Sequence, residues 1–118
     1  MTDIVAPLIA LLTIFFGAIG MFAPRWTAET LDFAPQGSTM GFSELRAGAG
    51  GLFVALGLYC LLTGAPAAYG ALGIAYLGAG AGRFLSILVD RPPMPKAAVF
   101  LAFEWGPAAI LLWLFWPL

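Results

Sequence analysis

Residues 78–96 read GAGAGRFLSILVDRPPMPK, a glycine-rich apolar run that carries one arginine and stops at a charged, proline-rich turn. Arg83 lies seven residues before Asp90, which is about 10 Å along an α-helix. An arginine at that depth of an apolar helix is unfavourable unless a carboxylate accompanies it. The stretch therefore predicts a membrane-spanning helix whose arginine pairs with an acidic side chain on a neighbouring helix.

The composition of the whole chain is that of a membrane protein. Of its 118 residues, 62% are hydrophobic and only 9% are charged, whereas roughly a quarter of the residues in a soluble domain are charged. At about 20 residues per span, this length allows four transmembrane helices and no separate soluble domain. We therefore expect an all-α integral membrane protein, with residues 1–118 forming one antiparallel four-transmembrane-helix bundle. The alternative, a soluble bundle of buried helices, would require a polar face along each helix.

Four apolar segments fit such helices, at about residues 4–23, 44–63, 67–89 and 96–118. Proline and glycine stand at every boundary between them. The short TGAP turn predicts that the second and third helices are antiparallel neighbours. Ser43 is suited to cap the second helix, and Pro95 is suited to begin the fourth. No basic residue precedes the first segment and no small-residue cleavage site follows it, so we expect a retained span rather than a signal peptide.

The connection between the first two segments is much longer and reads PRWTAETLDFAPQGSTMGF. Trp26, Thr30 and Phe33 are spaced at i, i+4 and i+7, which would place them on one face of a helix lying flat in the membrane interface. An ordinary ordered loop fits the same residues equally well. The sequence leaves both possibilities open.

The basic residues indicate how the chain is oriented. They lie on or near the side of the first and third connections: Arg25, Arg46, Arg83, Arg91 and Lys96. The tight turn and both terminal segments have none, so the positive-inside rule places the basic side in the cytoplasm and both termini in the periplasm of a bacterial inner membrane. The alanine- and glycine-rich composition also points to a bacterium. Trp26 would then lie at the inner interface, and Trp113 and Trp116 at the outer one.

Polar side chains on three of the helices are expected to meet in one layer: Glu44, Arg46, Arg83, Ser86, Asp90 and Glu104. Glu104 lies eight residues after Lys96, at a depth of about 12 Å, which is close to that of Arg83. Glu104 and Glu44 are therefore the expected partners of Arg83. Arg46 is the least secure member, because residues two apart on a helix point to different faces, and it could extend to the surface instead. The layer has two interpretations, a salt-bridge lock that sets helix register or a polar pocket for a ligand or protons.

Small residues also recur at helical spacing on two of the segments. Ala71, Ala75 and Ala79 lead along the third helix to Arg83, and the second helix carries a matching set: Ala47, Gly51 and Ala55. Such stripes let helices approach each other closely in lipid. We expect these stripes to serve close packing rather than ligand binding.

Several kinds of chemistry lack their usual residues. The chain has no His, which removes the commonest metal ligand, and one Cys, which excludes an intramolecular disulfide. Cys60 lies in an apolar run and is expected to be a small core residue or a lipid-facing one. A net charge of −1 gives no nucleic-acid footprint. We therefore expect no metal, no cofactor and no nucleic-acid partner.

These motifs together resemble a family of small bacterial four-helix membrane proteins, the domain of unknown function four-three-four-five. Its members typically show E-x-R at the start of the second helix, as at Glu44 and Arg46, and then a glycine-rich run. They also show G-R-x-x-S-x-x-x-D-x-P and a Glu in the fourth helix, which match Gly82, Arg83, Ser86, Asp90, Pro92 and Glu104. The chain departs from the pattern at Ser43, where Asn is more usual, and at Arg91, where Gly is common. The resemblance implies a fold and a motif set, but no activity.

Three classes of function can be compared on these residues. A non-enzymatic accessory, assembly or stabilising subunit of a larger membrane complex is favoured, because glycine- and alanine-rich faces suit packing against other helices in the bilayer. The alternative is a binder or carrier of a lipid or quinone-like molecule, with Arg83 holding the head group. An intramembrane enzyme is disfavoured, because Ser86 has no histidine base and arginine already accounts for the two buried acids.

Overall fold

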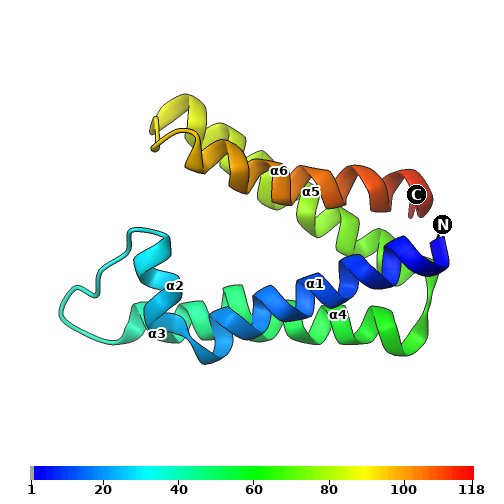
Figure 1. Cartoon of the computed structure of the whole chain (residues 1–118), viewed down its shortest axis with the longest axis horizontal. Coiled ribbons are helices and arrows are strands. Elements are labelled where there is room, and N and C mark those ends of the chain that lie inside the picture. Colours follow the sequence, from blue (N-terminus) through cyan, green and yellow to red (C-terminus); the bar gives the residue numbers. More distant parts are fainter. Residues whose placement is uncertain (1) are drawn as a thin grey trace. The chain divides into compact units, whose positions relative to one another are not determined.

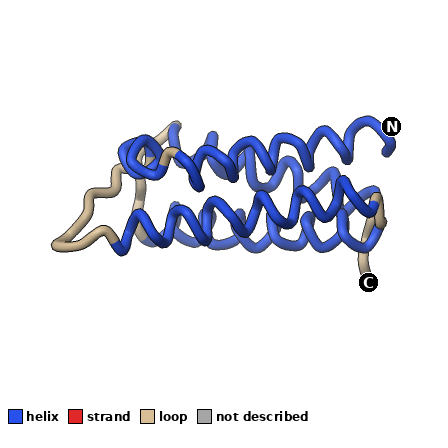
Figure 2. The backbone as a smooth tube through the Cα atoms, turned by 90° about the horizontal axis from the view of Figure 1, so that it is seen from below, coloured by secondary structure: helices blue, strands red, loops and turns tan. Residues whose placement is uncertain are grey.

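The computed structural model describes residues 2–118, with side chains from Asp3 onward, and within that range every regular element is a helix. The elements are, in order, α1 (Thr2–Phe22), α2 (Pro24–Thr30), α3 (Met40–Glu44), η1 (Leu45–Gly51), α4 (Leu52–Thr63), α5 (Pro66–Val89) and α6 (Lys96–Leu114). Contacts between residues divide the chain into two compact helical units, residues 3–63 and 64–118 (Figure 1). Figure 2 shows that loops occupy only the connections and the C-terminal end.

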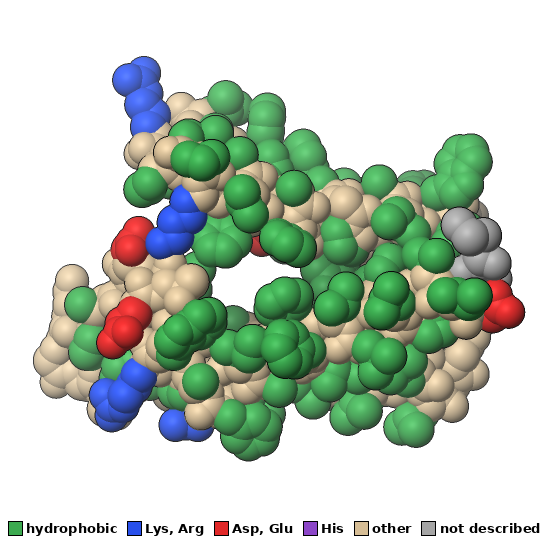
Figure 3. All heavy atoms as spheres, viewed as in Figure 1, with side chains coloured by type: hydrophobic (Ala, Val, Ile, Leu, Met, Phe, Trp, Pro, Cys, Tyr) green, Lys and Arg blue, Asp and Glu red, His purple; other side chains and the backbone are tan. Residues whose placement is uncertain are grey.

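Four helical stretches are long and apolar enough to cross a membrane: Asp3–Phe22, Met40–Thr63, Pro66–Val89 and Lys96–Leu114. They confirm the four predicted segments in number and order. In the face shown in Figure 3, hydrophobic side chains cover the length of the helices, and most charged side chains lie near helix ends. The organisation as a single domain and the assembly of the four helices into one antiparallel bundle stay predictions.

The second span begins earlier than predicted, and the prediction that Ser43 caps it is wrong. Helix α3 starts at Met40 with Thr39 at the N-cap position, and the Ser43 N–H donates to the Thr39 carbonyl at 3.1 Å. The apolar pattern marks only where a helix becomes hydrophobic, whereas the helical backbone extends outward through residues that the pattern does not detect. Pro95 likewise occupies the N-cap position of α6, one residue before its start.

In the N-terminal unit, α1 packs antiparallel against η1 and α4 (Figure 1). Gly57 lies against Ala10 and Ile14 in the middle of α1, whereas Gly50 lies against Met21 near its end. A Cβ atom on Gly50 would stand 2.6 Å from the backbone nitrogen of Met21, so only glycine permits this approach. Cys60 is completely buried, which makes it a core residue, one of the two positions predicted for it.

Residues Leu45–Gly51, LRAGAGG, form a π-helix where the sequence predicts a regular α-helix. In a π-helix each N–H bonds to the carbonyl five residues earlier, so the backbone is wider than in an α-helix. Three of these seven residues are glycine, and glycine tolerates departures from regular helical geometry. Hydrophobic periodicity cannot reveal this change within so short a segment, so the π-helix is not predictable from the pattern.

Part of the long connection is helical. Helix α2 turns away from the axis of α1 directly after Ala23 (Figure 1), and the hydroxyl of Thr27 donates to the Ala23 carbonyl at 2.9 Å. At the other end, the Phe33 N–H donates to the Ala28 carbonyl at 2.7 Å. Trp26 and Phe33 are exposed. A helix therefore carries Trp26 and Thr30, but Phe33 lies beyond its end at Thr30, and the position of the helix in the membrane interface stays a prediction.

In the C-terminal unit, α5 and α6 form an antiparallel hairpin. Gly73 lies against Leu111, which is completely buried, and the Tyr69 ring stacks on Phe115 with 5.4 Å between their centroids. The link from α4 to α5 is tight, as predicted, and Gly64 in this link has a φ of +59°. That left-handed conformation favours glycine. The antiparallel arrangement of α4 and α5 stays a prediction.

Within each unit, the closest contacts between helices are not made by the predicted alanine stripes, and a contact between the two stripes stays a prediction. The predicted members are exposed or only half-buried: Ala47, Gly51, Ala55, Ala71, Ala75 and Ala79. The closest contacts are made instead at Gly50 and Gly57 in the N-terminal unit and at Gly70, Gly73 and Gly80 in α5. Where backbones approach this closely even the methyl group of alanine does not fit, so glycine rather than regular spacing marks the contact face.

Candidate functional site

Arg83 and Glu104 form an ion pair with two parallel hydrogen bonds that joins α5 to α6. Arg83 Nε donates to Glu104 Oε1 at 3.0 Å, and Arg83 Nη2 donates to Glu104 Oε2 at 2.9 Å. A paired arrangement of this kind fixes the orientation of both groups as well as neutralising their charges. Glu104 is one of the two partners that helix depth predicts for Arg83, so the arginine in the apolar helix is accompanied by an acid.

The expectation that this salt bridge is buried needs correction. The side chains of Arg83 and Glu104 are 33% and 18% exposed, because two helices touch along one line and leave the outer side of the pair uncovered. Phe100 covers part of it, with its ring centroid 5.2 Å from the guanidinium carbon of Arg83. This cation–π contact holds the guanidinium in place without consuming its hydrogen-bond donors.

Trp105, which is not among the residues predicted from the sequence, positions the acid of this pair. Its Nε1 donates to the Leu77 carbonyl at 3.2 Å, and its ring stacks on Phe84 with 5.5 Å between centroids. The ring also lies where a Cβ atom on Gly80 would stand. Two features of the sequence could have indicated this contact: a tryptophan next to Glu104, and a glycine three residues before Arg83 on the facing helix.

Ser86 and Asp90 bond to each other rather than to the ion pair. The Ser86 hydroxyl donates to Asp90 Oδ2 at 2.8 Å, and Asp90 is exposed at the C-cap position of α5. Both residues are near Arg83 in sequence, but the side-chain hydrogen bonds of Arg83 go to α6. The Ser86–Asp90 bond therefore closes the last turn of α5.

The remaining two predicted site residues, Glu44 and Arg46, lie in the N-terminal unit. Arg46 Nη1 donates to the Met21 carbonyl at 2.7 Å, which satisfies one of the carbonyls left without a helical partner at the end of α1. Glu44 is exposed, and its Oε1 lies beside Gly48 on the same helical segment. The convergence of all six residues into one layer, and a contact between Glu44 and Arg83, stay predictions.

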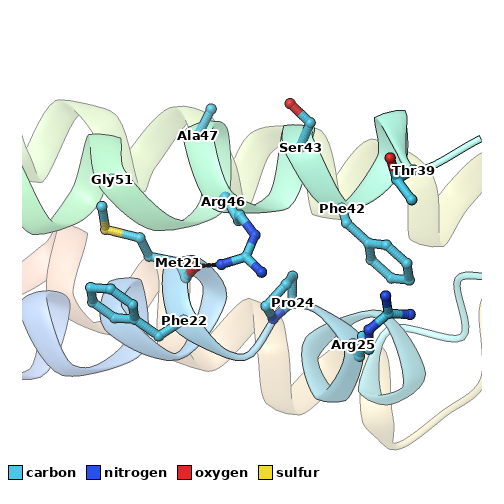
Figure 4. Close-up of a pocket in the computed structure, with 10 residues that line it drawn as sticks. All are labelled: Met21, Phe22, Pro24, Arg25, Thr39, Phe42, Ser43, Arg46, Ala47 and Gly51. Carbon is cyan, nitrogen blue, oxygen red and sulfur yellow. Dashed lines mark hydrogen bonds between the residues drawn. The ribbon is translucent and has the colours of Figure 1, made fainter.

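A pocket of about 680 Å³ lies within the N-terminal unit, between the α1–α2 corner and the α3–η1 segment (Figure 4). Arg25 and Arg46 both line it, and the guanidinium carbon of Arg25 lies 4.6 Å from the centroid of the Phe42 ring. The charge pattern of the sequence indicates only the orientation of the chain at Arg25, and it does not predict this pocket. The signal was a pair of arginines flanking the long connection, one just after the first span and one at the start of the second.

The fold and these sites define an all-helical membrane protein whose C-terminal helices are joined by an arginine–glutamate pair. The chain belongs to the family described as a domain of unknown function, DUF4345, which it matches over residues 1–115. This match confirms the resemblance drawn from the motifs. No curated protein and no solved structure matches the chain. Within residues 2–118, no three Cys, Asp or Glu side chains come together in a group that could hold a metal ion.

Proposed function

We propose that this protein is a non-enzymatic accessory, assembly or stabilising subunit of a larger membrane complex in a bacterial inner membrane. The observation that supports this function is an open glycine face on α5. Gly78 and Gly82 are exposed, and a Cβ atom on either would meet nothing within 4 Å. Ile74 and Leu85 lie on the same side of the helix and are 40% and 61% exposed.

In lipid, a pair of small residues four apart favours close approach by another helix, because backbone atoms can then touch directly. Helix α6 does not use this pair, since it meets α5 at Gly73 and Gly80. One set of glycines in α5 therefore joins the hairpin, and the pair at Gly78 and Gly82, which α6 leaves uncovered, is the face on which we propose that a helix of another membrane protein packs.

The ion pair supports a structural role over a catalytic one. Both carboxylate oxygens of Glu104 accept hydrogen bonds from Arg83, so Glu104 is engaged rather than available as a general acid or base. The same contacts weaken the alternative of a lipid or quinone carrier that works through Arg83, because a head group would have to displace Glu104. The termini are periplasmic in this proposal, on the strength of the positive-inside rule.

The proposal is tested with a photo-crosslinking residue at position Gly82 of the full chain in native membranes. The matched control carries the same residue at Gly106, which is also exposed with nothing within 4 Å but lies on α6. We expect position 82 to give one discrete product with another membrane protein, identified by mass spectrometry, and position 106 to give little of it. Purification of the unmodified chain in mild detergent should retain the same partner.

Two results would count against a subunit role. The first is that the crosslinker at position 82 reacts only with residues 3–63 of its own chain or only with lipid. The second is that the Gly82→Ile variant accumulates normally and still copurifies with the partner. This result would contradict the proposal because an isoleucine side chain should obstruct a helix that packs on this face.

A further inference from the structure

Two arginines enter the pocket of the N-terminal unit from opposite sides. Figure 4 shows Arg46 projecting from η1 towards the end of α1, and Arg25 projecting from α2 towards Phe42. The π-helical turn that begins at Leu45 carries Arg46, and the bend after Ala23 directs α2 and Arg25 back over the pocket. Both guanidinium groups are therefore placed by backbone features that depart from a plain transmembrane helix.

Within the described residues of the N-terminal unit, neither positive charge is neutralised by an ion pair. Arg46 contacts a backbone carbonyl, that of Met21, and Arg25 contacts an aromatic face, that of Phe42. Within residues 2–118 neither arginine forms an ion pair, and no carboxylate is among the residues that line the pocket. A guanidinium has five N–H donors, so these contacts orient both groups and leave most of their donors for a ligand.

The pocket also has two chemically different halves. Thr39 and Ser43 line the pocket together with the two arginines, whereas Met21 and Phe22 contribute apolar surface. Phe22 is the last residue of α1 and is 74% exposed. The apolar part thus continues directly from a helix that is apolar enough to cross a membrane, and the polar part lies where that helix ends.

We infer that this pocket binds the phosphate head group of an anionic phospholipid, with Arg25 and Arg46 on the phosphate oxygens and the acyl chains along Met21 and Phe22. The planar guanidinium matches two phosphate oxygens at once. A neutral quinone would leave both charges unpaired, and free phosphate would leave the apolar half unused. The pocket is lined by residues of the N-terminal unit alone, and the inference does not depend on the subunit role proposed above.

The experiment measures lipid retention by the full chain in detergent, using native mass spectrometry with added phosphatidylglycerol or with phosphatidylcholine of the same acyl chains. We expect phosphatidylglycerol to be retained in preference. Arg25→Gln and Arg46→Gln should each weaken its apparent affinity roughly fivefold, the effect of losing about one arginine's attraction to an anionic lipid. The matched control is Arg91→Gln, because Arg91 is also exposed but lies in the α5–α6 connection, and it should retain the lipid like the unchanged chain.

Several outcomes would overturn the inference. Equal retention of the two lipids would show that the pocket does not select an anionic head group. An equal loss in Arg91→Gln would show that general positive charge rather than the pocket attracts the lipid. Displacement of phosphatidylglycerol by millimolar inorganic phosphate would assign the site to a free anion. Since Arg46 also bonds to α1, its variant is checked for helicity by circular dichroism. Arg25 contacts the Phe42 ring rather than a backbone carbonyl, so full lipid binding by a folded Arg25→Gln would by itself disprove the assignment.

Discussion

The indole ring of Trp105 fills the space in which any side chain on Gly80 would stand. Trp105 Nε1 also donates a hydrogen bond, at 3.2 Å, to the carbonyl of Leu77, which lies three residues before Gly80 on α5. Because Glu104 is the residue next to Trp105, fixing the tryptophan on α5 also fixes where the carboxylate meets Arg83. The glycine, the tryptophan and the ion pair therefore act together to set the register of α5 on α6.

Replacing Gly80 by Ala is expected to destabilise the α5–α6 hairpin. The new methyl group would overlap the indole ring, and overpacking of this kind typically lowers the free energy of unfolding by about 1–3 kcal/mol. The measurement is reversible unfolding of the full chain in mixed micelles. Gly78→Ala is the control, because nothing lies within 4 Å of its added atom and its stability should be unchanged or slightly raised. An equal effect of both substitutions would contradict the contact.

Removing one partner of the ion pair should lower the free energy of unfolding more than removing both partners. Glu104→Gln leaves the Arg83 charge without its partner in an apolar surrounding, and Arg83→Gln does the same to Glu104. The double variant loses both charges, so a double-mutant cycle should give a coupling energy between about 0.5 and 3 kcal/mol.

The Ser86→Ala variant is the control for this cycle. It removes only the bond to Asp90 at the end of α5 and should change the free energy of unfolding by about 0.5 kcal/mol or less. Strictly additive effects of the Arg83 and Glu104 substitutions would show that the pair contributes no coupling.

Gly50→Ala is expected to push α1 away from η1. The added Cβ would stand 2.6 Å and 2.7 Å from the backbone nitrogen and Cα of Met21, and backbone atoms cannot rotate out of the way. We expect a loss of about 1–3 kcal/mol in the free energy of unfolding. Gly48→Ala lies in the same π-helix but would meet only the flexible Glu44 side chain, at 3.2 Å. Comparable losses in both variants would attribute the effect to the π-helix and not to the contact with α1.

The orientation of the chain can be tested with single cysteines in a Cys60→Ala background. Met94→Cys reports on the α5–α6 connection and Thr63→Cys on the α4–α5 turn, and both positions are exposed. The positive-inside rule predicts that an impermeant thiol reagent added to intact spheroplasts labels position 63 and not position 94. Labelling of position 94 and not of position 63 would show that the chain has the opposite orientation.

The amino-acid sequence was sufficient to predict the helical spans and the partner of one charge. The four apolar stretches follow from composition and length alone, because a span needs about 20 residues whatever its neighbours are. The Arg83–Glu104 pair follows from depth, since two helices entering from one side bring residues of equal depth to the same level. These properties are local to each helix or depend only on distance along it.

Only the tertiary structure decided which faces meet. Glycines at positions 50 and 80, rather than the regularly spaced alanines, accept Met21 and Trp105, and the π-helix directs Arg46 to the end of α1. The pocket between Arg25 and Arg46 arises from the bend at α2 and this π-helix together. Close contact depends on the shape of both partners at once, and the periodicity of a single helix has no information about the side chain that it will meet.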